Sequence, residues 1–139
     1  DVRTFLCGVY AKATAGQTLE PMEQLLWQWM VEHPHYHADF SDLPAALADM
    51  QTGQNNPSGT ESPFLHLSMH LAISEQCSID QPKGIRQAVE LLAARRGDLH
   101  QAHHEVMQCL GTMIWESQRS GKPPDGHAYI DAVQQRATQ

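Results

Sequence analysis

Apolar residues recur at three- and four-residue spacing along almost the whole chain, and proline or glycine interrupts this pattern at intervals. The spacing places apolar side chains on one face of an α-helix, and the alternation typical of β-strands is absent. Seven segments carry the helical pattern: 2–14, 19–33, 43–50, 63–79, 85–96, 99–120 and 127–137. The sequence therefore predicts an all-α fold, a compact helical bundle of five to seven helices.

Glycine, proline and short polar residues mark the predicted helix ends. Gly97 ends one helix, because glycine readily adopts the left-handed conformation found there, and Asp98 can cap the next helix. Thr18 is expected to cap the helix over 19–33. Pro34 ends that helix, because the residue before a proline is pushed out of the helical region.

A chain of 139 residues has the length of one domain. We therefore expect a single helical domain over 1–139. Within it, residues 52–62 read TGQNNPSGTES and are rich in glycine, asparagine, proline and serine. That composition predicts a surface loop.

Charge and hydropathy exclude two classes of partner. The chain has nine Lys and Arg and sixteen Asp and Glu, which gives a net charge of −7. This negative charge argues against a dedicated nucleic-acid binder. No apolar run approaches the roughly 20 residues that a membrane-spanning helix needs. The three cysteines have apolar neighbours and predict buried, reduced thiols, as expected of a cytoplasmic protein. A protein partner and a homo-oligomer both stay open.

Histidines are numerous, nine in all, and a spacing of four residues recurs among them. Random placement of nine histidines gives about 0.5 pairs four residues apart. The sequence holds three such pairs: His33/His37, His66/His70 and His100/His104. Side chains four residues apart are neighbours on a helix surface, so two imidazoles of a pair can converge on one ion.

Two of these pairs lie on long predicted helices, His66/His70 on 63–79 and His100/His104 on 99–120. Together they can supply four nitrogens to a metal ion, or three nitrogens and an open position for water. The sequence therefore predicts a transition-metal site, with zinc and iron as the favoured ions. The carboxylates that could orient the rings from outside are Glu75, Asp98 and Glu116.

A metal-free interpretation also fits these histidines. The helix over 63–79 is apolar on most sides, which predicts burial of His66 and His70. A buried imidazole needs a polar partner, and backbone carbonyls, Ser68 or Ser74 can serve as well as a metal. His103 is expected to be exposed and solvated.

The cluster from His33 to His37 is interrupted by Pro34. It predicts a loop without a ligand role. A surface metal site and a pH-sensitive contact are the alternatives, because imidazole titrates near neutral pH.

Several known chemistries are missing from the sequence. Glu32-x-x-His35 is the single match to the Glu-x-x-His motif of di-iron bundles, and it straddles Pro34. The motifs His-Glu-x-x-His and Cys-x-x-Cys are absent, as are the nucleotide-binding glycine loops and Gly-x-Ser-x-Gly. Cys77 falls near the His66/His70 face, so a Cys–His pair stays open.

Four runs of sequence resemble a small, largely proteobacterial family: EPMEQLLWQWMVEHPHYH, SPFLHLSMHLAISEQCSIDQPKGIR, RRGDLHQAHHEVMQCLG and WESQRSGKPPDGHAY. This family is catalogued as domain of unknown function eighteen-forty-one, and the string HLSMHLAISEQ is fairly specific to it. The resemblance implies a bacterial, cytoplasmic protein in which a short segment precedes Asp1. It implies no activity.

The paired histidines are also similar, more weakly, to two classes of metal-binding bundle. Hemerythrin-type bundles bind two irons but need a His-x-x-x-Glu that this sequence lacks, and His127-x-x-x-Asp131 is a near approach to it. DinB-like bundles use a three-histidine site, and histidines on separate helices are compatible with it.

Two functions follow from these observations. The first is a helical metal-binding protein with His66, His70, His100 and His104 as ligands, an enzyme if one position stays open and a metal-stapled fold if none does. The second is a metal-free accessory subunit of a larger complex. In that case Trp27, Trp29 and Met30 could form an anchor surface, although core packing is the favoured interpretation of that stripe.

Overall fold

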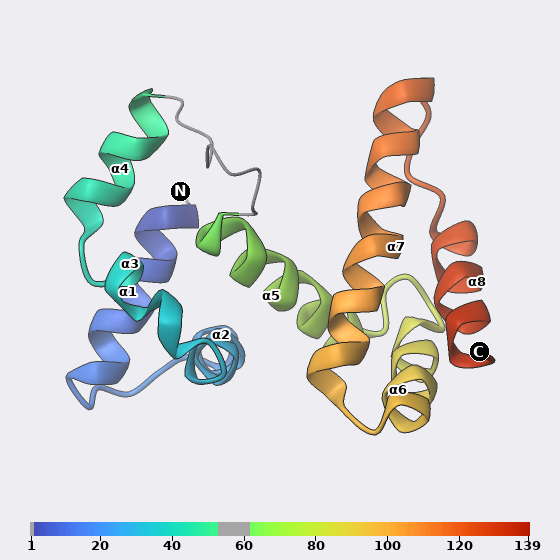
Figure 1. Ribbon diagram of the computed structural model, residues 1–139, viewed down its shortest axis with the longest axis horizontal. Helices are drawn as coiled ribbons and strands as arrows, with labels where there is room; N and C mark the ends of the chain where they lie inside the picture. Colours follow the sequence, from blue (N-terminus) through green and yellow to red (C-terminus); the bar gives the residue numbers. More distant parts are fainter. Residues whose placement is uncertain (1, 53–61) are drawn as a thin grey trace. The chain divides into compact units, whose positions relative to one another are not determined.

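The computed structural model describes residues 2–52 and 62–139, and the chain divides into two compact units, Asp1–Leu71 and Ala72–Gln139. The described residues form eight α-helices and one short 3-10 helix, and none of them lies in a β-strand (Figure 1). The all-α fold is therefore confirmed. The expectation that 1–139 is a single domain stays a prediction.

The number of helices differs from the expected five to seven. The additional helix is α3 (His37–Phe40), which follows the 3-10 helix η1 (Pro34–Tyr36) in a stretch expected to be a loop. Proline fits the first turn of a helix, because its fixed φ is already helical. Phe40 is 1% exposed and anchors the turn in the core of unit 1.

Unit 1 is built around α1 (Val2–Thr14), which packs against α2 (Pro21–Val31), α3 and α4 (Leu43–Thr52). The first half of α5 (Pro63–Ile79) completes it, and the Phe64 ring of α5 meets the Phe40 ring edge-on at 5.5 Å. The buried cluster consists of Leu6, Cys7, Val9, Leu26, Trp29, Met30, Phe40, Ala46, Phe64 and Leu67. Of the predicted loop at 52–62, Thr52 ends α4 and residues 53–61 lie outside the described part of the chain.

The start of α2 is set by Pro21 and not by Thr18, so the predicted cap is wrong. The backbone N–H of Glu20 donates to Oε1 of Glu23 at 2.8 Å, which satisfies one of the free donors at the helix start. Lys12 of α1 pairs with the same carboxylate at 3.0 Å. Glu23 therefore caps the start of α2 and links α2 to α1 through an ion pair.

Helix α5 is less buried than its apolar sequence suggests. Leu65 is 52% exposed and Ile79 is 60% exposed. Burial is confined to one stripe at three-residue spacing: Phe64, Leu67, His70 and Ile73. The expected burial is therefore confirmed for His70, whereas His66 is only half-buried.

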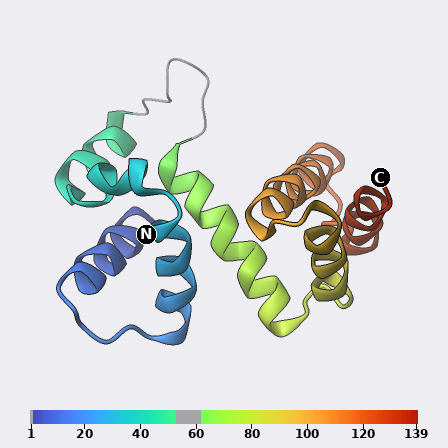
Figure 2. The same cartoon turned by 60° about the horizontal axis from the view of Figure 1, so that its bottom comes forward.

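Unit 2 comprises the second half of α5 and three helices that pack pairwise, α6 (Ile85–Arg96), α7 (Leu99–Ser120) and α8 (Gly126–Ala137) (Figure 1, Figure 2). Its buried apolar side chains are Ile73, Ile85, Ala88, Val89, Leu92, Ala102, Val106, Met107, Cys109, Leu110, Tyr129 and Val133. Gly97, at φ 73°, ends α6, and Asp98 accepts hydrogen bonds from the first backbone N–H groups of α7. Both predicted helix ends are confirmed.

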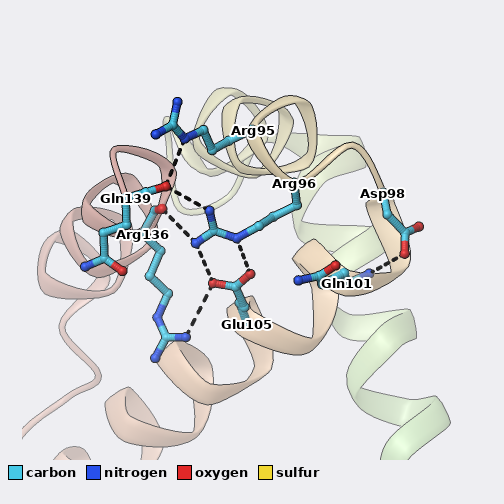
Figure 3. Close-up of polar contacts among 7 residues, drawn as sticks. All are labelled: Arg95, Arg96, Asp98, Gln101, Glu105, Arg136 and Gln139. Atoms are coloured by element: carbon cyan, nitrogen blue, oxygen red, sulfur yellow. Dashed lines mark hydrogen bonds and ion pairs between the residues drawn. The ribbon is translucent and has the colours of Figure 1, made fainter.

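A charged cluster joins the three helices of unit 2 at one end (Figure 3). The Arg96 guanidinium donates two hydrogen bonds to the Glu105 carboxylate, at 2.6 and 3.0 Å, and Arg136 Nη1 lies 3.7 Å from it. Arg96 also donates to the backbone carbonyls of Arg136 and Gln139, each at 3.0 Å. One arginine on α6 therefore contacts α7 and the end of α8 together.

No helix in the described ranges combines the length and the apolar character required to cross a bilayer.

Replacing Glu105 with Gln should lower the thermal unfolding midpoint by several degrees, because it removes the carboxylate that both arginines face. Hydrogen bonds from Arg96 hold the pKa of Glu105 below its usual value. Its stabilisation is therefore complete above the ordinary glutamate pKa of about 4.3 and disappears as the pH falls through the lowered folded-state pKa. Thermal melts between pH 3 and pH 7 measure this.

Glu116→Gln is the matched control, because Glu116 pairs with Arg119 on the exposed surface of α7. An exposed pair contributes little stability, so this variant should melt close to the wild type at every pH. Equal losses in the two variants would contradict the role assigned to Glu105.

Candidate metal centre

His66 and His70 lie one turn apart on α5, and their rings meet nitrogen to nitrogen. Nε2 of His70 is 3.2 Å from Nε2 of His66, with the ring planes at 80°. Two imidazole nitrogens on one tetrahedral ion lie about 3.3 Å apart, because each metal–nitrogen bond is about 2.0–2.1 Å. The predicted pair thus has the separation that shared coordination requires.

His33 supplies a third imidazole to this pair. It is 3% exposed, and its ring centroid lies 5.0 Å from that of His66 and 5.0 Å from that of His70. The ligand atoms of the three side chains lie within 4.8 Å of one another. Three rings bound to one tetrahedral ion would have centroids about 5.2 Å apart, so the triad of His33, His66 and His70 fits a metal ion.

The His33 ring is held by the end of α2. Its Nδ1 lies 2.7 Å from the carbonyl oxygen of Trp29, so Nδ1 carries the proton and donates. In the neutral ring Nε2 then keeps the lone pair that can bind a metal. Metal-binding histidines commonly use this arrangement, in which the second nitrogen donates to a carbonyl and fixes the ring.

The sequence pattern does not predict His33 as a ligand, because Pro34 indicates a loop without a ligand role at this position. The helix ends before the proline, and His33 continues the buried face of α2. A signal was present in the spacing, since His33 follows Leu26, Trp29 and Met30 at seven, four and three residues.

Aromatic rings enclose the triad within unit 1. The Trp29 ring stacks on His70, with centroids 4.0 Å apart and planes 16° apart. Tyr36 lies parallel to His33 at 5.3 Å and edge-on to His66 at 5.9 Å. These contacts restrict rotation of the three imidazole rings.

His37 has a different role. Its Nε2 donates to the carbonyl oxygen of Met30 at 2.7 Å, and its ring packs 5.2 Å from Tyr10. The Met30 carbonyl also accepts the backbone N–H of His33 at 3.0 Å, so His37 adds a side-chain donor to the last turn of α2.

The predicted pair of unit 2 lies on the first turns of α7. The rings of His100 and His104 are 4.6 Å apart at 75°, and their ligand atoms also lie within 4.8 Å. His100 is half-buried and His104 is exposed. This pair too has the geometry of two donors for one ion.

His103 is buried, at 2% exposure, so the expectation of a solvated side chain is wrong. It lies on the apolar stripe of α7, three residues before Val106 and four before Met107. Burial, with smaller contributions from His100 and His104, lowers the pKa of His103 to about 3. Its ring is therefore neutral near pH 7.

The predicted supporting carboxylates have other contacts. Asp98 accepts from the backbone N–H groups of His100 and Gln101 at the start of α7, and Glu116 pairs with Arg119 at 2.8 Å. Glu75 is exposed. The group that orients a ring is instead the backbone carbonyl of Trp29, which contacts His33. A backbone group of this kind cannot be predicted from the pattern of side chains.

The cysteines are free thiols and are protonated near neutral pH. Cys7 and Cys109 are buried and Cys77 is half-buried. Burial raises the pKa of all three, and for Cys77, where the charge of Glu90 adds to the effect, it reaches about 11. The environment of Cys77 therefore does not favour a nucleophilic thiolate.

Unit 2 also contains a groove of about 950 Å³ between α7 and α8. Its lining mixes apolar side chains such as Met113 and Tyr129 with the charged Glu116, Lys122 and Asp125. No histidine is among its lining residues, so the groove and the histidine chemistry are separate features.

A family model described as Domain of unknown function (DUF1841) matches residues 1–135. The chain belongs to this family. The match confirms the resemblance seen in the sequence and covers all the histidines described above. No curated protein and no solved structure matches the chain. For this DUF1841 protein, the histidine geometry is therefore the basis for a functional argument.

The three thiols of the native DUF1841 protein should react slowly with Ellman's reagent. With a pKa of about 11, only about 0.1% of Cys77 is ionised at pH 8. Absorbance at 412 nm should rise at least about tenfold more slowly than in urea-unfolded protein at the same pH. Fast labelling that Cys77→Ser abolishes would contradict a protonated Cys77 and restore the Cys–His alternative.

Proposed function

We propose that this protein binds a transition-metal ion through histidine side chains, with His66 and His70 at the centre of the site. The observation that carries the proposal is the 3.2 Å separation of their Nε2 atoms. This separation matches the distance between two ligand nitrogens on one tetrahedral metal ion. Both rings also pack against aromatic neighbours, His70 against Trp29 and His66 against Tyr36.

His33 is proposed as a further ligand of the same ion. Its Nδ1 proton is used by the Trp29 carbonyl, which directs metal binding to Nε2. Imidazole ligands suit zinc and iron, as well as nickel and copper. Zinc and iron stay the predicted ions.

The four-ligand set predicted from the sequence, His66, His70, His100 and His104, stays a prediction. Its support is that each pair, within its own unit, has two rings close enough to bind one ion. Three imidazoles leave a tetrahedral ion one position for water, whereas four fill the shell. The ligand count therefore decides between a reactive ion and a structural one.

Elemental analysis by mass spectrometry of untagged protein, purified without chelator, should find close to one zinc or iron per chain. The double variant His66→Ala/His70→Ala should lose the metal, or bind it at least about 100-fold more weakly, while keeping its helical circular dichroism. His127→Ala is the matched control, since it removes an exposed histidine of α8 and should keep full metal content.

The variant His100→Ala/His104→Ala tests the four-ligand set. Loss of the ion from this variant as well would support four ligands on one ion. Unchanged content would leave the ion with the triad of unit 1. A folded quadruple variant, with all four histidines replaced, that keeps its metal would overturn the proposed site.

The metal-free accessory subunit is the second candidate. Trp29 and Met30 are buried in the core of unit 1 and Trp27 is half-buried against it, so these three side chains offer no anchor surface. Trp115 and Ile114 on α7 are 57% and 42% exposed, and tryptophan is enriched where proteins bind one another. Wild-type protein that stays empty after incubation with zinc, iron(II) and nickel would favour this function.

A further inference from the structure

The nitrogens of the triad in unit 1 are poorly accessible to a hydrated ion. His33 is 3% exposed, His70 is fully buried and His66 is half-buried. A divalent ion arrives with a shell of water and has to exchange these waters for nitrogens one at a time. Exchange is easier when a first protein ligand holds the ion at the surface.

His35 is the only exposed histidine in the described part of unit 1. It lies in η1, and its ring centroid is 5.7 Å from that of His33. Two imidazoles that share one ion have centroids between about 4.5 Å, for a right angle at the metal, and about 6.4 Å, for opposite positions. The separation of the His33 and His35 rings falls within this range.

The backbone keeps His35 beside His33. Pro34 fixes φ between them, and the backbone N–H of Tyr36 donates to the carbonyl of His33 at 3.0 Å. The Tyr36 ring lies 4.2 Å from His35 and stacks on His33. The short turn thus presents one solvent-exposed imidazole and one buried imidazole at a fixed spacing.

We propose that His35 is the entry ligand through which a divalent transition-metal ion reaches the triad of His33, His66 and His70. This inference rests on the proposed metal-binding function. His35 replaces one water on the hydrated ion, and His33 then replaces a second while His35 still holds the ion. His66 displaces a third water and His70 then displaces His35, so each new metal–nitrogen bond replaces one bond to the ion and no electron is transferred.

His37, the neighbouring histidine on the other side, is unsuited to this role. It is half-buried, and its Nε2 is engaged with the Met30 carbonyl. His35 is exposed and suited to capture an ion, whereas His37 caps the end of α2 through its hydrogen bond.

Stopped-flow mixing with Co²⁺ tests the proposal, with quenching of tryptophan fluorescence as the signal. Trp29 stacks on His70, so an ion on the triad should quench it, and Trp29→Phe should remove that signal. His35→Ala should lower both the association and the dissociation rate by at least about tenfold, a barrier change of about 1.4 kcal/mol. The Kd and the number of ions per chain should stay within about twofold, because the final ligands are unchanged.

Two more variants make the result specific. His35→Asp restores an exposed metal donor and should recover most of the association rate. His127→Ala removes an exposed histidine from unit 2 and should leave both rates unchanged.

The outcomes are distinguishable. Wild-type protein that binds no Co²⁺, zinc or iron overturns the proposed function. Binding with an unchanged association rate in His35→Ala overturns the entry role alone. A large loss of affinity at an unchanged association rate also overturns it, because it makes His35 a permanent ligand.

Discussion

The hydrogen bond from His33 to the Trp29 carbonyl connects the folding of unit 1 to its candidate site. It satisfies a carbonyl at the end of α2, fixes the His33 tautomer and holds the ring beside His66 and His70. The residue that accepts this bond also stacks its indole on His70. A single helix end thus provides both one donor nitrogen and the surface against which another is packed.

Most of the helices could be predicted from the sequence, because their periodicity and caps are local. Gly97 and Asp98, for example, mark a helix end and the next helix start by their own conformational preferences. α3 could not, since four residues are too few for a periodic pattern, and the buried Phe40 holds it through tertiary contacts. The predicted cap of α2, Thr18, is wrong because the Glu23 side chain accepts the hydrogen bond at the helix start. The same carboxylate pairs with Lys12 of α1.

The site divides in the same way between local and tertiary information. The proximity of His66 to His70, and of His100 to His104, follows from helical geometry alone. The position of His33 beside α5 depends on how α2 packs against α5. This packing cannot be predicted from the spacing of residues in one sequence. His103 was misjudged for a related reason, because its line on α7 faces the other helices of unit 2.

The close sequence spacing of Trp29, His33 and Pro34 has a consequence for how this segment can vary. A helical residue inserted between Trp29 and His33 would rotate the imidazole by about 100° around the α2 axis. It would also separate Nδ1 from the carbonyl one turn earlier. A change of length would thus move His33 away from His66 and His70, whereas many side chains of similar volume could replace the apolar neighbours. The number of residues in the segment from 29 to 36 is therefore constrained, whereas the surrounding helical core tolerates substitution.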